Sequence, residues 1–236
     1  MNARLAPSPQ AYRVVDDGAV DMPAAAVDVW RGSLPASDAL LRARFNALVR
    51  SPHGAPVLRA VEHEADGVVG FLALAPRPMR CGARALRAGV LSHFAILPEH
   101  RSLGPALMLI EAVLQAASDR FDLAYGIPNA HQGASAVLRR GGFRPLAELE
   151  RSVRIVRHGP YLARRTHRAL ATPAGLAVDA ADAMRRHWSR LRRPRLRARW
   201  VEQHVPEMDA PWAASGPHAA LAAVRDGTML RWRFDQ

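Results

Sequence analysis

The residues with the clearest chemical potential lie between Leu91 and Leu114, in the sequence LSHFAILPEHRSLGPALMLIEAVL. An apolar run ends at a proline, a short polar loop follows, and Gly104 opens a long apolar pattern with helical spacing. A strand, a tight loop and a helix in this order direct free backbone N–H groups and the positive end of a helix dipole at one point. Helix N-termini of this kind bind phosphate groups, so the segment predicts a pyrophosphate site.

Three side chains near this segment are suited to proton transfer, and we consider them as catalytic candidates. Ser92 and His93 lie on the predicted strand, and His131 lies on a later predicted helix. Because residues alternate across a strand, His93 faces away from Ser92 unless a β-bulge redirects it. Histidine suits a general base. The alternatives are an ordinary sheet histidine for His93 and a helix-surface or capping role for His131.

The elements that must position these residues alternate between strands and helices. Strands are predicted over 12–15, 57–62, 68–75, 85–97, 122–126, 143–146 and 149–156, and helices over 21–30, 37–49, the segment after 104 and the segment from 128 to 141. Residues 76–84 are predicted to form a loop. This order predicts an α/β domain, with a mixed, mostly antiparallel sheet flanked by helices.

The length and the charge of the chain predict a basic extension beside this α/β domain. The chain has 236 residues, of which 49% are hydrophobic, enough for one domain and an extension. It contains no lysine, and its net charge is +12. Residues 151–199 hold 14 arginines but only Asp179 and Asp182 as acids, and 174–190 read as a basic helix. This stretch fits a solvated connector, a contact with an anionic membrane surface, or a nucleic-acid backbone contact without sequence specificity.

Several classes of site and location are disfavoured. No run of about 18 apolar residues predicts a transmembrane helix, and the N-terminus lacks the apolar core of a signal peptide, which favours the cytoplasm. A single cysteine, Cys81, leaves no intrachain disulfide or cysteine metal cluster. Glu62, His63 and Glu64 resemble a metal or acid–base cluster, but a solvated turn is the favoured interpretation. No metal site is therefore predicted.

Arg101 to Ala106 fits the pattern arginine/glutamine-x-x-glycine-x-glycine/alanine. With the strand before it and the helix after it, the segment resembles motif A of the GNAT (GCN5-related) N-acetyltransferase superfamily, and the element order over 12–157 agrees. The resemblance implies acetyl-CoA or another acyl-CoA as co-substrate, held by loop amides at its pyrophosphate and by the strand end along its pantetheine arm. The residues implied to bind it are Phe94, Ala95, Ile96, Leu97, Arg101, Ser102, Leu103, Gly104, Pro105, Ala106 and Asn129.

Two of these residues also have a purely structural interpretation. Pro105 lacks an N–H for the cradle, but proline is well tolerated where a helix begins. Asn129 fits the N-cap of the next predicted helix, with or without a contact to the cofactor arm.

The catalytic positions depart from the family pattern. The usual base positions on the strand correspond to Val90 and Ser92, and the usual acid, a tyrosine, corresponds to Leu138. None of these side chains is a carboxylate, a histidine or a phenol. Solvent would then protonate the leaving thiolate, and transfer would depend mainly on proximity.

Further motifs narrow the resemblance to one GNAT subgroup. The string YGIPN at 125–129, followed by Gly142-Phe143, resembles proteins associated with envelope and polysaccharide genes, whose longer members carry a second GNAT-like half. The string LRWRF at 230–234 matches a motif of that second half. The implied plan is a disordered N-terminus at 1–11, an acyl-CoA-binding domain at 12–157, an arginine-rich helical connector at 158–199, and an incomplete second unit or tail at 200–236.

The function implied by the resemblance is acyl-CoA-dependent N-acyl transfer, chiefly of acetyl groups, to a primary amine on a small molecule or saccharide. Two alternatives remain open. One is aminoacyl transfer of the two-half peptidoglycan-bridge type, in which the arginines would bind tRNA. The other is a catalytically degenerate domain that binds CoA or a partner, which the missing tyrosine and carboxylate favour.

Overall fold

The computed structural model of the chain describes residues 11–16, 18–128, 133–147, 155, 157–191, 199–216 and 221–234. It contains two compact units. One consists of Met1–Pro145 together with Val201–Gln236, and the other of Leu146–Trp200. The sequence placed the boundaries at 157 and 199 instead, with the last residues separate from the first domain.

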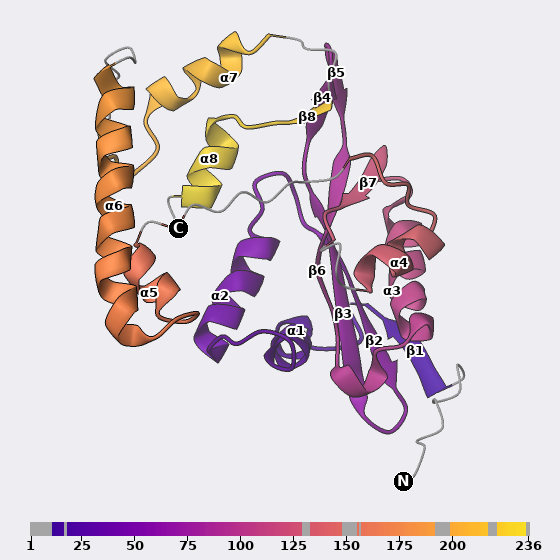
Figure 1. The fold of residues 1–236 in the computed structure, drawn as a ribbon. Helices are drawn as coiled ribbons and strands as arrows, with labels where there is room; N and C mark the ends of the chain where they lie inside the picture. The colour runs from indigo at the N-terminus through magenta and orange to yellow at the C-terminus, as the bar shows by residue number, and fades with distance from the viewer. Residues whose placement is uncertain are drawn as a thin grey trace. The chain divides into compact units, whose positions relative to one another are not determined.

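Five strands form the central sheet of the first unit, in the order β1-β2-β3-β6-β7 (Figure 1). Their bounds are Tyr12–Val15 for β1, Val57–His63 for β2, Gly67–Pro76 for β3, Ala88–Ile96 for β6 and Leu123–Gly126 for β7. Neighbouring strands run antiparallel except β6 and β7, which are parallel. The predicted mixed, mostly antiparallel sheet is therefore confirmed.

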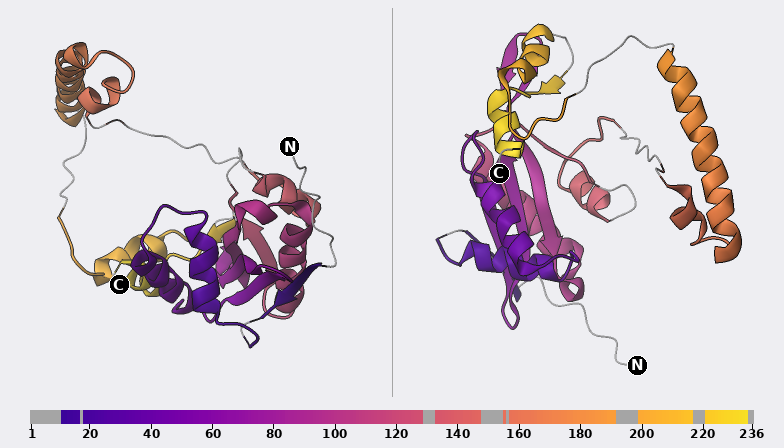
Figure 2. Two further views of the ribbon diagram at one scale, coloured as in Figure 1. Left: turned by 90° about the horizontal axis from the view of Figure 1, so that it is seen from below. Right: turned by 90° about the vertical axis from the view of Figure 1, so that its left-hand side faces the viewer.

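Helices cover both faces of this sheet (Figures 1 and 2). Helices α1 (Met22–Arg31) and α2 (Asp38–Val49) pack on one face, while α3 (Leu103–Ala117) and α4 (Ala134–Arg140) lie on the other. The core under α1 and α2 contains Trp30 and Phe71, and the opposite core contains Leu109. These apolar faces follow the helical and strand periodicities read from the sequence.

The predicted strand 85–97 is two strands, β5 (Arg84–Leu86) and β6. They separate at Arg87, whose backbone N–H donates to Asp122 Oδ2 at 2.8 Å instead of continuing the ladder. The predicted loop 76–84 also contains a strand, β4 (Met79–Cys81), which forms a hairpin with β5 across Gly82 at φ +58°. The sequence missed both features because three-residue strands carry little periodic signal.

The predicted strand 143–146 is wrong, since residues 143–147 contain no strand. The N–H of Phe143 donates to Leu138 O at 3.0 Å, and Gly142 adopts φ +87°. These are the features of a left-handed helix C-cap, so this segment closes α4. The predicted strand 149–156 lies almost entirely outside the described residues.

The C-terminal residues of the first unit pack on its own elements. They form η3 (Pro206–Met208), α7 (Ala210–Ala214), β8 (Leu221–Ala223) and α8 (Gly227–Phe234). Strand β8 pairs with β4, giving a three-stranded sheet in the order β5-β4-β8. Trp232 Nε1 on α8 donates to Ala47 O on α2 at 3.2 Å. This segment therefore contributes to the first unit.

The second unit contains α5 (His158–Leu162) and α6 (Arg168–Leu191). The predicted helix 174–190 is confirmed, with an earlier start. Gly175 lies against Gly159 so closely that an added Cβ would meet its Cα at 2.4 Å, so the two helices meet where both lack side chains. No helix in the described part of the chain is both long and apolar enough to cross a membrane.

Candidate functional site

The main opening in the central sheet lies between β6 and β7. Their parallel pairing ends at Leu91 and Gly126, although β6 continues to Ile96. Among the described residues, none pairs with 92–96 on that side. Backbone N–H and C=O groups on a free strand edge need partners. This edge can therefore receive an extended ligand through main-chain hydrogen bonds.

A β-bulge lies in the same stretch of β6, in its pairing with β3. Ser92 pairs with Ala73 and Ala95 pairs with Phe71, so two residues of β6 stand opposite one residue of β3. His93, in the bulge, has φ +59°, which is uncommon for a residue other than glycine. Of the two orientations that the sequence left open for His93, the structure has the one produced by a bulge, and His93 lies on the α1 side together with Ser92.

His93 is held there by Trp30 of α1. The two ring centroids are 4.9 Å apart, and Trp30 Nε1 donates to His93 O at 3.3 Å. Burial, together with a smaller effect of the positive charge of Arg44, lowers the pKa of His93 to about 4. The imidazole is therefore neutral at pH 7 and has a free lone pair. Nδ1 of His93 and Oγ of Ser92 are both buried without a hydrogen-bond partner.

The loop between β6 and α3 is tied to its surroundings by Arg101. This loop contains the short helix η2 (Pro98–His100). Arg101 Nε donates to Ile96 O at 3.0 Å, and its Nη2 donates to Ser33 Oγ at 3.1 Å. The side chain predicted to bind the co-substrate thus fastens the loop to β6 and to the connection between α1 and α2.

Two backbone amides remain free where α3 begins. Ser102 N–H donates to His100 O at 2.7 Å, so this amide already has an acceptor in the structure. The N–H groups of Leu103 and Gly104 have no acceptor among the described residues, and no side chain caps α3. An added Cβ on Gly104 would meet nothing within 4 Å. Open space therefore lies in front of a helix N-terminus with free donors, as a phosphate site requires.

The other predicted cofactor residues divide by burial. Ile96, Pro105 and Ala106 are buried, while Phe94 and Leu97 are half-buried and pack against the α3 core. Contacts from these positions would come from the backbone. Asn129 and His131 lie outside the described residues.

The position of the expected acid is filled by a core side chain. Leu138 is 8% exposed and packs in the α3 core. A phenol lies on the other face of the sheet: half-buried Tyr125 on β7 pairs with Val90, which puts it on the same face as Ser92. Burial raises the pKa of Tyr125, so the phenol stays protonated at pH 7. Trp30 and Ser33 carried no sequence motif, and Tyr125 belongs to the YGIPN string but was not a catalytic candidate, because only long-range packing brings these residues to the site.

Comparisons with known proteins gave structural similarity only. No protein-family model matches the sequence, and no curated protein matches it significantly. Glucosamine-6-phosphate N-acetyltransferase from Arabidopsis thaliana is similar at 9% identity and TM-score 0.45, over 60% of this chain and 97% of that one. Aminoglycoside 6'-N-acetyltransferase from Acinetobacter haemolyticus is similar at 14% identity and TM-score 0.44, over 61% of this chain and 98% of that one. An aminoglycoside N-acetyltransferase in complex with CoA is similar at 15% identity and TM-score 0.47, over 61% of this chain and 93% of that one.

Proposed function

We propose that the first unit binds an acyl-CoA and transfers its acyl group to a primary amine. The observation that carries the proposal is the end of β6–β7 pairing at Leu91, on the strand that leads into α3. It gives a free strand edge for the pantetheine arm, and the free N–H groups of Leu103 and Gly104 lie where the pyrophosphate would follow. The motif at 101–106 and its resemblance to GNAT proteins support the same ligand.

In the proposed reaction the thioester lies at the bulge, beside Ser92 and His93. The amine attacks the carbonyl carbon, a C–N bond forms, the C–S bond breaks and CoA leaves as a thiolate. Neutral His93 accepts the proton released by the amine, through its unpartnered Nδ1. With a pKa of about 4 it is a weak base. It can act because the amine nitrogen becomes far more acidic as the C–N bond forms.

Tyr125 is our candidate for the acid that protonates the thiolate. We expect Tyr125→Phe to lower kcat by about a hundredfold, the lower end of general-acid effects, with little change in acyl-CoA affinity. Steady-state release of free CoA measures this effect, and Tyr161→Phe in the second unit is the matched control. An unchanged kcat would assign protonation of the thiolate to solvent.

A binding domain without turnover is the second candidate. It is favoured by Leu138, a buried side chain at the position where the resemblance places the acid. This candidate keeps acyl-CoA binding but predicts no amine-dependent release of CoA.

A thermal-shift screen with CoA esters tests the proposed function. We expect acetyl-CoA or a longer acyl-CoA to raise the unfolding temperature, because a ligand that binds only the folded state stabilises it. At 100 times the Kd, the gain is about 2.7 kcal/mol. Dephospho-CoA and pantetheine separate the contributions of the phosphates and of the arm. If no CoA ester shifts the transition, the acyl-CoA assignment is wrong.

A further inference from the structure

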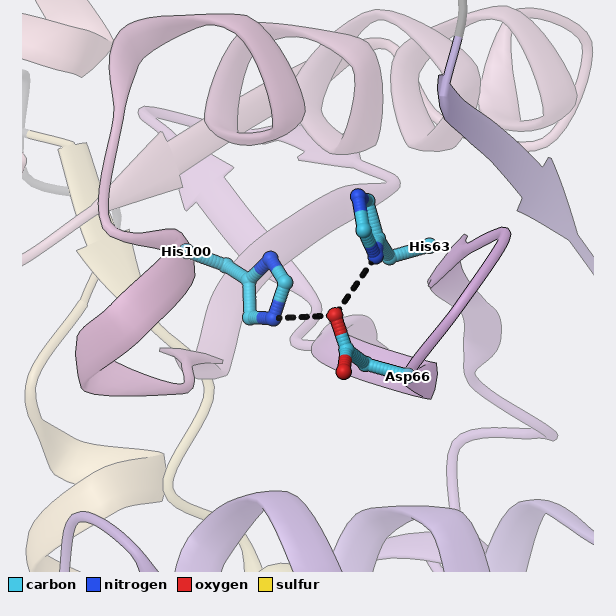
Figure 3. A group of neighbouring side chains, drawn as sticks. All are labelled: His63, Asp66 and His100. Atoms are coloured by element: carbon cyan, nitrogen blue, oxygen red, sulfur yellow. Dashed lines mark ion pairs between the residues drawn. The ribbon is translucent and has the colours of Figure 1, made fainter. Parts of the chain in front are cut away.

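We propose that His63, Asp66 and His100 form a site for a divalent transition-metal ion of the Zn²⁺ class. Figure 3 shows the three side chains pointing toward one another. His63 Nδ1 lies 2.6 Å from Asp66 Oδ2, and His100 Nε2 lies 3.4 Å from the same oxygen. Two imidazole nitrogens and one carboxylate oxygen are a donor set that Zn²⁺ and related ions accept, with water completing the coordination.

The three ligands come from elements that the sheet fixes in place. His63 ends β2, Asp66 lies in the turn before β3, and His100 ends η2. One ligand atom from each residue lies within 4.8 Å of the others. Bonds of about 2.0–2.2 Å to one ion hold ligand atoms within about 4 Å of each other. The two histidine nitrogens must therefore approach each other by up to about 1 Å through rotation of their rings. The 53% exposed Asp66 side chain can move away from His63 to admit the ion.

An outer partner orients one of the two histidines. Tyr12 Oη lies 3.1 Å from His100 Nδ1, and both side chains are buried. When Nδ1 donates to Tyr12, Nε2 presents its lone pair toward Asp66, and this is the tautomer that a metal ion requires. Histidine ligands typically have such a second partner on the other ring nitrogen. The Tyr12 ring also packs against His63, with centroids 5.0 Å apart.

Nearby charged residues do not compete with the two histidines for the Asp66 carboxylate. Glu62, next to His63, is paired with Arg13 at 2.7 Å. In the part of the chain that the structure describes, no arginine forms an ion pair with Asp66, although the protein is rich in arginine. The sequence predicted no metal here, because His63 and His100 are far apart along the chain.

The proposed ion would join the β2–β3 turn to the loop that leads into α3. His100 directly precedes Arg101, so the ion would hold one end of that loop. We therefore expect Zn²⁺ to increase acyl-CoA affinity several-fold. This consequence rests on the proposed function, whereas the metal site does not.

Calorimetric titration of the untagged full chain with Zn²⁺ tests the site, and the absorption spectrum of bound Co²⁺ reports its coordination. We expect one ion per chain and a higher unfolding temperature. Asp66→Asn retains the shape of the side chain but removes its charge, and should weaken binding at least about tenfold, as losses of metal-site partners do. Tyr12→Phe should weaken it less. The exposed His167→Gln is the matched control and should bind as the wild type does.

Two results would overturn the site: no Zn²⁺ binding by the wild type, or equal binding by the Asp66→Asn/His100→Gln double variant. The first would leave an ion-paired His–Asp–His group, and the second would place the ion elsewhere. Both measurements are made without CoA, so they do not depend on the proposed function. Conversely, acetyl-CoA binding is measured once with Zn²⁺ and once with a chelator. If acetyl-CoA binds under neither condition, the proposed function fails while the metal result stands.

Discussion

Gly104→Glu should reduce acyl-CoA affinity by at least about a hundredfold without unfolding the protein. The open space in front of Gly104 is where the pyrophosphate is proposed to lie, so a carboxylate there would face like charge. At an effective dielectric constant of about 20, two unit charges about 4 Å apart repel by about 4 kcal/mol, or roughly a thousandfold in affinity. Isothermal titration with acetyl-CoA measures the loss.

Two properties make this substitution a clean test. An added Cβ meets nothing at Gly104, and no positive φ is recorded there, so a larger residue causes no clash or backbone strain. Replacing glycine within a helix stabilises it by about 0.5–1 kcal/mol, and an acidic side chain near its N-terminus is favourable. Unfolding temperature should therefore be unchanged or higher.

Gly104→Gln is the matched control for size. It is as large as glutamate but neutral, so the difference between the two variants isolates the charge effect. If Gly104→Glu binds acetyl-CoA as tightly as the wild type, the pyrophosphate does not lie at the start of α3.

His93→Asn should lower kcat about a hundredfold, at the lower end of general-base effects, and leave acyl-CoA affinity within about threefold. Asparagine is among the residues that tolerate the left-handed backbone found at His93, so the bulge should persist. Single-turnover release of CoA in the presence of an amine measures the loss, and Ser92→Ala tests the neighbouring hydroxyl. A kcat equal to that of the wild type would remove His93 from the mechanism.

His93→Asn should also change how the stability of the folded protein depends on pH. Burial lowers the pKa of His93 to about 4 in the folded state, whereas the unfolded state keeps the ordinary value of 6.5. Between these values only the unfolded state takes up the proton, so this contribution to stability is present above pH 6.5 and is lost as the pH falls toward 4. The full effect is up to about 3 kcal/mol. Urea unfolding should show a weaker loss at low pH for His93→Asn, and identical pH profiles would indicate a solvated imidazole.

Prediction from the sequence was most successful for long, periodic elements. β1, α1, α2, β2, β3, α3 and β7 were found within a few residues of their bounds, while α6 begins six residues earlier than predicted. Two of the failures share a physical cause. Arg87 leaves the β6 ladder for Asp122, and Phe143 closes α4 through Leu138 O. Each strand boundary is set by one hydrogen bond. The spacing of hydrophobic residues does not predict such a bond.

The sequence alone determined the strand, loop and helix around Gly104 and the position of His93 beside Ser92, because local patterns depend on neighbouring residues. Only the tertiary structure decided that a bulge turns His93 toward Trp30, that β6 and β7 part after Leu91, and that His63 meets His100. Pairing register and helix packing fix those contacts. They arise between residues distant in the chain, whose approach no local spacing encodes.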